Sequence, residues 1–482
     1  MEFPDLSNYV SPLSWRYGSN EMRRIFSEEN KYRLWRKIWV NLAKIQYEAG
    51  LVSKEELVDL VANENDLDIP RILEIEMETR HDVMAAIKEF AEKAKVGGGK
   101  IHLGATSMDV VDNADMIRTK EALILVEQNL KKLLAIFLEQ IEKYARLPCI
   151  GFTHIQPAEP TTVGYRLAFY AQDLLTDISL LQSIKVLVKA KGFKGAVGTR
   201  ASYTALLKGN KLTADMLDKM VMKSLGLESD LVTTQVYSRK YDYLVLTLLA
   251  SIASSCAKFA GDLRILQSPP LGEWSEPFGK KQVGSSAMPF KKNPVNSEKI
   301  CSLARFVGAL PPVALENATL SYLERTLDDS ANKRIIMAES FIAVDEILLI
   351  TQKVISGLVV NKERVAFNLN QYGPFAATEV ILVEAVKNGG DRQKLHELLR
   401  ELSLEAWSDI GQGEKNPLPQ MLMENHELHK YLTKSQIEGL LDVSNHIGDA
   451  PQRALELVGK IKKMLRACLE TGFLSFRPQR TK

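Results

Sequence analysis

The sequence predicts an all-α protein organised around a bundle of long helices. Proline, which breaks the interior of a helix, is absent from residues 162–267 and again from residues 314–372. Apolar residues recur at helical spacing over segments 114–145, 162–191, 239–267 and 330–359. Each segment would form a helix about 45 Å long. Alternating strand patterns are scarce elsewhere, which completes the argument for a helical fold class.

The most apolar part of these segments must lie inside the molecule. Residues 243–260 are apolar on nearly every face of a helix, and such a helix is buried all round. Several long helices are therefore expected to pack against it as a bundle. A bundle this apolar also favours packing between the bundles of separate subunits.

Composition places the chain among ordinary globular proteins. It has 482 residues, of which 45% are hydrophobic and 25% charged, and its formal net charge is +2. This balance offers no basic stripe for nucleic acid. The most apolar run, residues 244–253, is too short to span a bilayer. We therefore expect neither a nucleic-acid nor a membrane partner.

Cysteine spacing and the first residues indicate a cytoplasmic protein. The four cysteines form no CxxC pair, which argues against a disulfide framework or a zinc site. The first residues lack the basic and apolar regions of a signal peptide. His426 and His429 are three residues apart, not four as in the HExxH motif. We expect no metal and no organic cofactor.

A chain of this length is expected to form more than one domain. The glycine run at residues 97–99 marks a break near the end of the first domain. We expect this N-terminal helical domain to comprise residues 1–111. Residues 112–364 would form the long-helix domain, and residues 365–482 a C-terminal helical domain.

The most informative stretch runs from Gly284 to Pro294 and reads GSSAMPFKKNP. It begins with small residues and ends at a helix start, where Asn293 is expected to cap the helix and Pro294 to take its first position. Two hydroxyls and the flexible Lys291 side chain suit a catalytic lid. Such a lid needs a group that moves a proton and donors for a developing negative charge.

A rigid loop presents the best-placed histidine. In segment 153–162, two prolines fix the backbone around His154, and the threonines at the end of the segment can cap the long helix that follows. A histidine held in this way suits proton transfer near neutral pH. His81 and His102 also lie among polar residues and turn signals, unlike the histidines of the C-terminal third.

Two helix starts are expected to bind anions. Thr106 and Ser107 precede a long helix, and hydroxyls and backbone N–H groups at such a start form an anion site. Another long helix opens near Ser330, which shares a face with Arg334, while Arg325 can reach in from the preceding loop. A helix N-terminus, a hydroxyl and two guanidinium groups make a good cradle for a phosphomonoester.

The 284–294 stretch closely resembles the signature of the fumarase/aspartase superfamily, whose members eliminate fumarate from substituted succinates. Other segments resemble one branch of that superfamily, the adenylosuccinate lyases. These segments are residues 14–17, 80–83, 108–113, 234–240 and 325–334. The resemblance covers nearly the whole chain from Arg16 onward.

The resemblance implies a role for each matching residue. Ser285 would be the catalytic base, His154 the general acid, and Glu298 the carboxylate that orients this histidine. Lys291 would stabilise the carbanion, and His81 is assigned to catalysis beside the substrate phosphate. The residues expected to bind substrate are Arg16, Tyr17, Arg80, His81, Asp82, Thr106, Ser107, Thr153, Gln235, Ser286, Met288, Asn293, Arg325, Ser330 and Arg334.

The resemblance also implies an activity and an assembly. The chain would cleave adenylosuccinate to AMP and fumarate, and SAICAR (the succinylated aminoimidazole carboxamide ribotide) to AICAR and fumarate, by non-hydrolytic elimination in purine biosynthesis. Relatives form homotetramers in which each active site draws on three subunits. Two alternatives remain open: a sibling lyase such as argininosuccinate lyase or fumarase, and a catalytically silent structural homologue. The siblings need no phosphate site, and the presence of the acid–base residues argues against a silent homologue.

Overall fold

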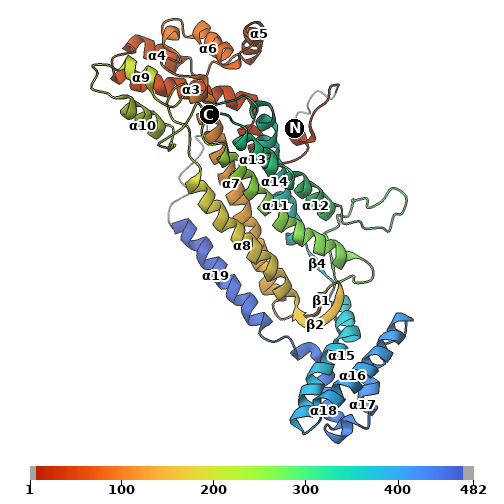
Figure 1. The fold of residues 1–482 in the computed structure, drawn as a ribbon. Helices are drawn as coiled ribbons and strands as arrows, with labels where there is room; N and C mark the ends of the chain where they lie inside the picture. Colours follow the sequence, from red (N-terminus) through yellow and green to blue (C-terminus); the bar gives the residue numbers. More distant parts are fainter. Residues whose placement is uncertain (1–6, 471–482) are drawn as a thin grey trace. The chain divides into compact units, whose positions relative to one another are not determined.

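The computed structural model describes residues 7–470 and is composed mainly of helices (Figure 1). The chain divides into two compact units. The first comprises Met1–Leu130, Asp177–Ser254 and Ser302–Leu349, and the second comprises Lys131–Thr176, Ser255–Cys301 and Ile350–Lys482. This division cuts through long helices and does not test the expected domains, residues 1–111, 112–364 and 365–482, which stay a prediction.

Short and medium helices lie wholly within the first unit. They are α1 (Pro12–Trp15), α2 (Asn20–Ile25), α3 (Glu28–Glu48), α4 (Lys54–Ala62), α5 (Ile69–Thr79), α6 (Asp82–Lys93), the 3-10 helix η1 (Gly98–Lys100), α9 (Ala201–Leu206), α10 (Ala214–Ser224) and α13 (Pro311–Thr319). Serine side chains begin several of them: Ser19, Ser27 and Ser53 each accept the N–H three residues ahead. Such caps satisfy donors that have no partner inside the helix.

Long helices belong partly to each unit. They are α7 (Ser107–Tyr144), α8 (Val163–Leu187), α11 (Lys240–Gln267), α12 (Val295–Gly308) and α14 (Ser330–Ser356). The four long helices expected from the sequence are therefore confirmed. The expected threonine cap of α8 is confirmed as well, because Thr162 Oγ1 accepts the Tyr165 N–H at 3.1 Å.

Buried polar pairs tie the long helices together within the first unit. Asn129 on α7 donates to Asp345 on α14 at 2.8 Å, and Ser251 on α11 donates to Asp177 on α8 at 2.6 Å. Because a buried polar group without a partner is costly, each pair fixes how two neighbouring helices align.

The second unit contains the strands and the remaining helices. Strands β1 (Pro148–Thr153) and β2 (Gln156–Thr162) form an antiparallel hairpin that packs on α15, and β3 (Trp274–Ser275) pairs with β4 (Val359–Val360). The helices are α15 (Lys362–Lys387), α16 (Arg392–Gly411), α17 (Leu418–Glu424), α18 (Lys434–Leu441) and α19 (Ala450–Glu470), with 3-10 helices η2 (Leu428–Lys430) and η3 (Val443–Asn445).

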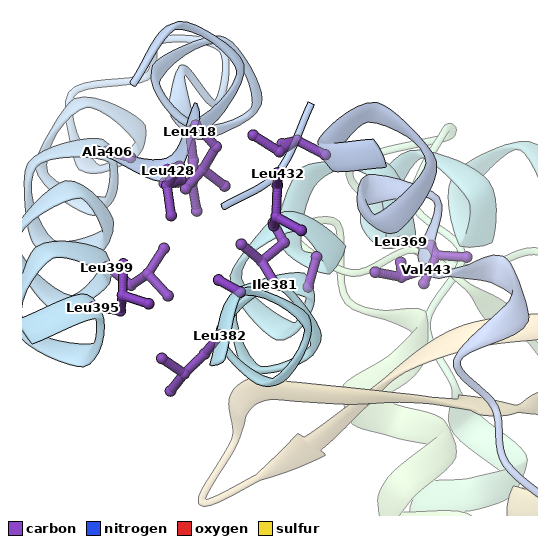
Figure 2. Packing of buried hydrophobic residues seen from close by; sticks show 14 of the residues in the cluster. Leu369, Ile381, Leu382, Leu395, Leu399, Ala406, Leu418, Leu428, Leu432 and Val443 are labelled. Carbon is purple, nitrogen blue, oxygen red and sulfur yellow. The ribbon is translucent and has the colours of Figure 1, made fainter. Parts of the chain in front are cut away.

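Helices α15 to α18 enclose a hydrophobic core of their own. Figure 2 shows leucines of α16, among them Leu395 and Leu399, facing Ile381 and Leu382 of α15. Leu418 and Leu428 close the core from the segments that follow, and both side chains are fully buried. Apolar burial of this kind is the main force that holds short helices together.

Helix α11 is the described helix that has the length and composition to cross a membrane, with a mean hydropathy of 1.6 over its most apolar stretch. The expectation from residues 244–253 alone underestimated this helix. Half of that stretch is buried inside the structure. The core helix of a globular bundle has the same composition, because it too is apolar on all sides.

Candidate active site

Residues 284–293 form a loop that leads into α12 and closes on itself (Figure 1). We call it the lid loop. Asn293 Nδ2 donates a hydrogen bond to the Gly284 carbonyl oxygen (2.9 Å), and the Lys291 N–H donates to Met288 O (3.1 Å). A Cβ atom on Gly284 would lie 2.0 Å from Lys291 O. Only glycine therefore lets the two ends of the loop approach this closely.

Backbone donors of the lid loop surround the Ser285 hydroxyl. The N–H groups of Ala287 and Met288 point at Ser285 Oγ, at 3.3 and 3.1 Å. Hydrogen bonds to an oxygen favour its anionic form, so this arrangement suits a serine that acts as a base. The side chains of Ser286 and Lys291 are exposed.

The start of α12 differs from the expectation in two respects, the capping residue and the first helical residue. Asn293 does not cap the helix with its side chain, because its amide holds the lid loop instead. The cap is Glu276, whose buried carboxylate accepts the N–H groups of Asn296 (3.2 Å) and Ser297 (2.5 Å). A carboxylate at a helix N-terminus is favourable because the free N–H groups there carry partial positive charge. Pro294 precedes Val295, the first residue of α12.

The segment around His154, predicted as a rigid loop fixed by prolines, is a β-hairpin. His154 and Ile155 form a two-residue turn closed by the Thr153–Gln156 pair, and both have positive φ angles of 53° and 62°. Such hairpin turns need positive φ at both positions and usually contain asparagine or glycine. The prolines of β2 are tolerated because this short strand pairs on one side, with a bulge near Gly151.

A strained turn thus presents the candidate acid. A β-branched residue at positive φ is a true outlier, and strain of this kind gathers at functional sites. His154 is exposed, as is Glu298 in the first turn of α12. Within residues 7–470 of this single chain, no hydrogen bond or ion pair joins His154 to Glu298, and the expected orienting contact stays a prediction.

The predicted phosphate segment lies in a charged cluster of the first unit. Asp329 directly precedes α14, and its Oδ1 lies 3.8 Å from Arg325 Nη2. Arg239 Nε donates to the other oxygen of Asp329 at 2.6 Å. The Gln235 N–H donates to the Glu324 carbonyl at 3.3 Å, which brings the expected glutamine segment beside Arg325.

A second contact joins α14 to the segment around His81. Arg334 Nη2 pairs with Asp82 Oδ2 at 3.1 Å. His81 is the N-cap of α6, because its Nδ1 accepts the Met84 N–H at 3.3 Å. That acceptor role leaves the proton of a neutral imidazole on Nε2. Arg80 adopts a left-handed conformation (φ 53°) at the turn between α5 and α6.

Arg16 and Tyr17 do not reach the phosphate segment of the same chain. The following residues fasten this turn to α14, where the Gly18 N–H donates to Glu346 (2.9 Å) and the Ser19 N–H donates to Asp345 (2.7 Å). Asp345 lies 15 residues beyond Ser330 along α14. At 1.5 Å per residue the two are about 22 Å apart.

Thr106 and Ser107 lie at the start of α7, where sequence reasoning expected them. The carboxylate of Asp109 accepts the Thr106 N–H at 3.0 Å, and it also accepts the N–H groups of Lys194 and Gly195 and the ammonium of Lys191. The buried Asp109 therefore ties the helix start to the loop of residues 191–200. An acid three residues after a helix-start threonine is the capping-box pattern, which is the signal that sequence reasoning left unused.

Gly198 belongs to the same loop and has φ +83°. Its backbone packs against another segment of the protein, because a Cβ atom there would lie 1.9 Å from Thr233 O. The glycine is required for two backbone segments to touch.

His102 accepts a hydrogen bond from a buried tryptophan. Trp39 Nε1 donates to His102 Nδ1 at 3.0 Å. Burial lowers the pKa of His102 to about 4, although nearby Asp109 acts in the opposite direction. His102 is thus neutral at physiological pH and keeps its proton on Nε2.

The described histidines of the C-terminal third lie in no cluster that could bind a metal ion. His429 contacts the Met423 carbonyl through Nε2 at 2.9 Å. Over the described residues, no group of three or more His, Cys, Asp or Glu side chains is placed to hold a metal ion. Cys149, Cys256 and Cys301 are buried cysteines.

Two family models match the chain. A lyase family matches residues 18–308, and the C-terminal family of adenylosuccinate lyases matches residues 374–456. The chain is 38% identical over 463 residues to the adenylosuccinate lyase of Saccharomyces cerevisiae, covering 95% of each. The chain belongs to the adenylosuccinate lyases. It is therefore a carbon–nitrogen lyase, and the predicted family is confirmed.

The adenylosuccinate lyase family is matched at similar levels in distant organisms. The enzyme of Pyrococcus abyssi is 37% identical over 459 residues, which cover 95% of this chain and 99% of that one. The enzyme of Schistosoma mansoni is 37% identical over 454 residues, covering 93% and 94%. Each of these two alignments therefore spans nearly the whole length of both proteins.

Solved structures confirm the predicted helical fold class. A fumarate lyase from Mesorhizobium sp. BNC1 superimposes with a TM-score of 0.81 at 21% identity, covering 92% of this chain and 98% of that one. A 3-carboxy-cis,cis-muconate lactonizing enzyme from Pseudomonas putida gives 0.83 at 23% identity, covering 94% and 99%. Adenylosuccinate lyases thus share this fold with enzymes of other specificity.

Proposed function

We propose that the chain cleaves adenylosuccinate to AMP and fumarate, and SAICAR to AICAR and fumarate, in purine biosynthesis. The observation that carries this proposal is the start of α14. There Arg325 has a buried Nη1 atom with no hydrogen-bond partner among the described residues, and Ser330 opens the helix. A helix N-terminus and a free guanidinium N–H suit the phosphate that both substrates carry.

The chemistry is a β-elimination. Ser285 removes a proton from the carbon next to a carboxylate of the succinyl group. The electron pair of that C–H bond becomes the double bond of fumarate, and the pair of the C–N bond leaves on nitrogen. His154 donates a proton to that nitrogen. General acid–base catalysis of this kind typically raises the reaction rate by about 10²- to 10⁴-fold.

Lys291 and the backbone N–H groups of the lid loop stabilise the carbanion that forms first. This charge spreads onto the carboxylate next to the carbon, and fixed donors are most effective where charge develops. Asn293 and Met288 position the succinyl part, while Thr106, Ser107 and Thr153 bind its carboxylates. Glu298 orients His154 from the neighbouring chain.

A homotetramer with shared sites accounts for the single-chain geometry. His154 and Glu298 are both exposed, and Arg16 and Tyr17 are anchored far along α14 from Ser330. Residues that serve one site and lie apart in one chain can meet when subunits associate symmetrically. The apolar faces of the long helices supply the contact. We place this assembly in the cytoplasm and assign it three domains per chain.

Purified protein mixed with adenylosuccinate tests the proposal directly. Loss of ultraviolet absorbance with release of fumarate is the expected result, and Ser285→Ala should lower kcat by about 10³-fold. Lys280→Ala, an exposed position just before the lid loop with no proposed role in the site, is the control for folding. Near-normal turnover by a tetrameric Ser285→Ala variant would disprove the assignment of the base. Fumarate release from argininosuccinate but not from adenylosuccinate would favour a sibling activity.

A further inference from the structure

Arg239 is a buried arginine that joins two carboxylates from different elements. Its Nη1 and Nη2 donate to the two oxygens of Asp112 on α7, at 3.2 and 3.1 Å, and its Nε donates to Asp329 at 2.6 Å. The side chains are 3%, 0% and 6% exposed. A bidentate pair fixes the plane of a guanidinium group. The direction from which Arg239 reaches Asp329 is therefore fixed by Asp112.

Asp329 stands between Arg239 and Arg325. Its Oδ1 is 3.8 Å from Arg325 Nη2, which is beyond hydrogen-bond distance. Arg325 Nη1 is buried and, over the described residues, has no hydrogen-bond partner. Leaving a buried donor without a partner costs stability. An anionic ligand that accepts this N–H would remove that cost.

The same cluster carries the glutamine segment. The Tyr237 N–H donates to Asp112 Oδ2 at 2.9 Å, and the Arg239 guanidinium lies over the Tyr237 ring, 4.5 Å from its centroid. The Gln235 N–H meets the Glu324 carbonyl, directly before Arg325. Arg239 is thus held by α7 and by its own segment, independently of Arg325.

Without Arg239, the Asp329 carboxylate would lose the cation that, among the described residues, donates a hydrogen bond to it. An unpaired buried carboxylate is unfavourable. Arg325, four residues earlier and only 3.8 Å away, is the nearest replacement. A rotation of the Asp329 side chain would make a close ion pair with Arg325. That pair would occupy the N–H groups of Arg325 and cancel its charge.

We propose that Arg239 is a positioning residue for the substrate phosphate: by binding Asp329 it keeps this carboxylate from pairing with Arg325, whose free N–H groups then bind the phosphate. This inference rests on the proposed function, because it assumes that a phosphomonoester occupies the start of α14. Arg239 itself touches no substrate atom.

The test compares adenylosuccinate with its nucleoside form, succinyladenosine, which lacks the phosphate. In the full tetramer, Arg239→Lys should raise KM for adenylosuccinate about tenfold, because lysine cannot hold both carboxylates in the arginine geometry. The kcat value should change less than threefold, and kcat/KM for succinyladenosine should stay within threefold of wild type. Adding Asp329→Asn to Arg239→Lys should restore KM, since the competing charge is gone.

Two further variants keep the test decisive. Asp329→Glu extends the side chain so that its carboxylate can reach Arg325. It should also raise KM for adenylosuccinate but not for succinyladenosine, and it replaces Arg239→Lys as the test if that variant does not fold. Arg118→Lys is the matched control, because Arg118 is a mostly buried arginine of the same unit that pairs with Asp115. It should lower thermal stability without a preference between the two substrates.

Arg325→Met distinguishes an error in the location of the phosphate site from an error in the role of Arg239. If the loss caused by Arg325→Met is the same for both substrates, the phosphate site is not at the start of α14 and this inference fails, whereas the proposed function fails only if the wild-type protein does not release fumarate from adenylosuccinate. If Arg325→Met weakens only adenylosuccinate while Arg239→Lys weakens both substrates equally, the inference alone is overturned. Failure of Asp329→Asn to restore KM would also overturn it.

Discussion

His102 shows how burial sets the charge of one residue beside the candidate site. Its ring accepts a hydrogen bond from Trp39, and its backbone has a φ angle of 65°. Burial lowers the pKa of His102 to about 4, so the folded protein holds it neutral. The unfolded chain, with a pKa near the usual value of about 6.5, binds the proton much earlier as pH falls.

Stability should therefore decrease on acidification through His102. Above pH 6.5 both states leave the ring neutral, and between pH 6.5 and 4 only the unfolded state takes up the proton. Through this linkage the free energy of unfolding should fall by about 2 kcal/mol between pH 7 and pH 5. In His102→Gln, urea unfolding at these two pH values should show a correspondingly smaller difference than wild type. An unchanged difference would mean that His102 is not the responsible group.

Helix α12 is an element whose position depends on one distant carboxylate. Glu276 accepts two backbone N–H groups and the Asn296 amide at 2.9 Å, and it is only 5% exposed. The same first turn carries Glu298. The cap thus links the stability of the helix to the placement of a residue proposed to orient the acid.

Glu276→Ala should destabilise the protein by about 2 kcal/mol, because it leaves buried N–H groups without an acceptor. It should also lower kcat more than it raises KM, since Glu298 would lose its fixed position. Thermal unfolding and steady-state kinetics measure the two effects. Glu276→Gln keeps one acceptor oxygen and should fall between wild type and alanine. Wild-type stability in Glu276→Ala would show that the cap is dispensable.

The lid loop allows a second test at this scale. Gly284→Ala places a Cβ atom 2.0 Å from Lys291 O and forces the ends of the loop apart. We expect kcat to fall at least about tenfold because the lid positions the base and the carbanion donors. Gly279→Ala is the control in the same segment, because its Cβ atom has no neighbour closer than 3.8 Å. Equal kcat values for both variants would contradict the closed geometry of the loop.

At the scale of the molecule, the long helices expose apolar side chains that an assembly of subunits would cover. Several large apolar side chains on them are exposed, including Phe169 (54%) and Ile335 (57%). Covering such side chains in an assembly would remove apolar surface from water, which is favourable. A tetramer would cover it and bring together residues that one chain keeps apart.

Shared sites predict complementation between inactive variants. Ser285→Ala and His154→Gln should each be nearly inactive alone. If different chains supply these residues to one site, random mixed tetramers regain up to about a quarter of wild-type activity. Refolding the two variants together and measuring fumarate release tests this. No recovery, in tetramers shown to be mixed, would place both residues of each site on one chain.

The sequence predicted those features that depend on local pattern. Long proline-free periodic segments became α7, α8, α11 and α14, and the GSSAMPFKKNP stretch became a closed loop before a helix. The hairpin at His154 was missed because prolines and a bulge obscure its alternating pattern. The Glu276 cap and the Arg239–Asp112 pair join residues 20 and 127 positions apart. Such contacts depend on tertiary packing, which periodicity does not encode.

The closed geometry of the lid loop has a consequence for the speed of turnover. Its own hydrogen bonds, from Asn293 to Gly284 and from Met288 to Ser285, order the segment before any substrate arrives. A loop that orders only on binding loses on the order of 1 kcal/mol of conformational entropy per residue in each cycle. A preformed loop loses that freedom once, during folding. A lid loop ordered in this way would open and close as one segment, with its internal hydrogen bonds kept.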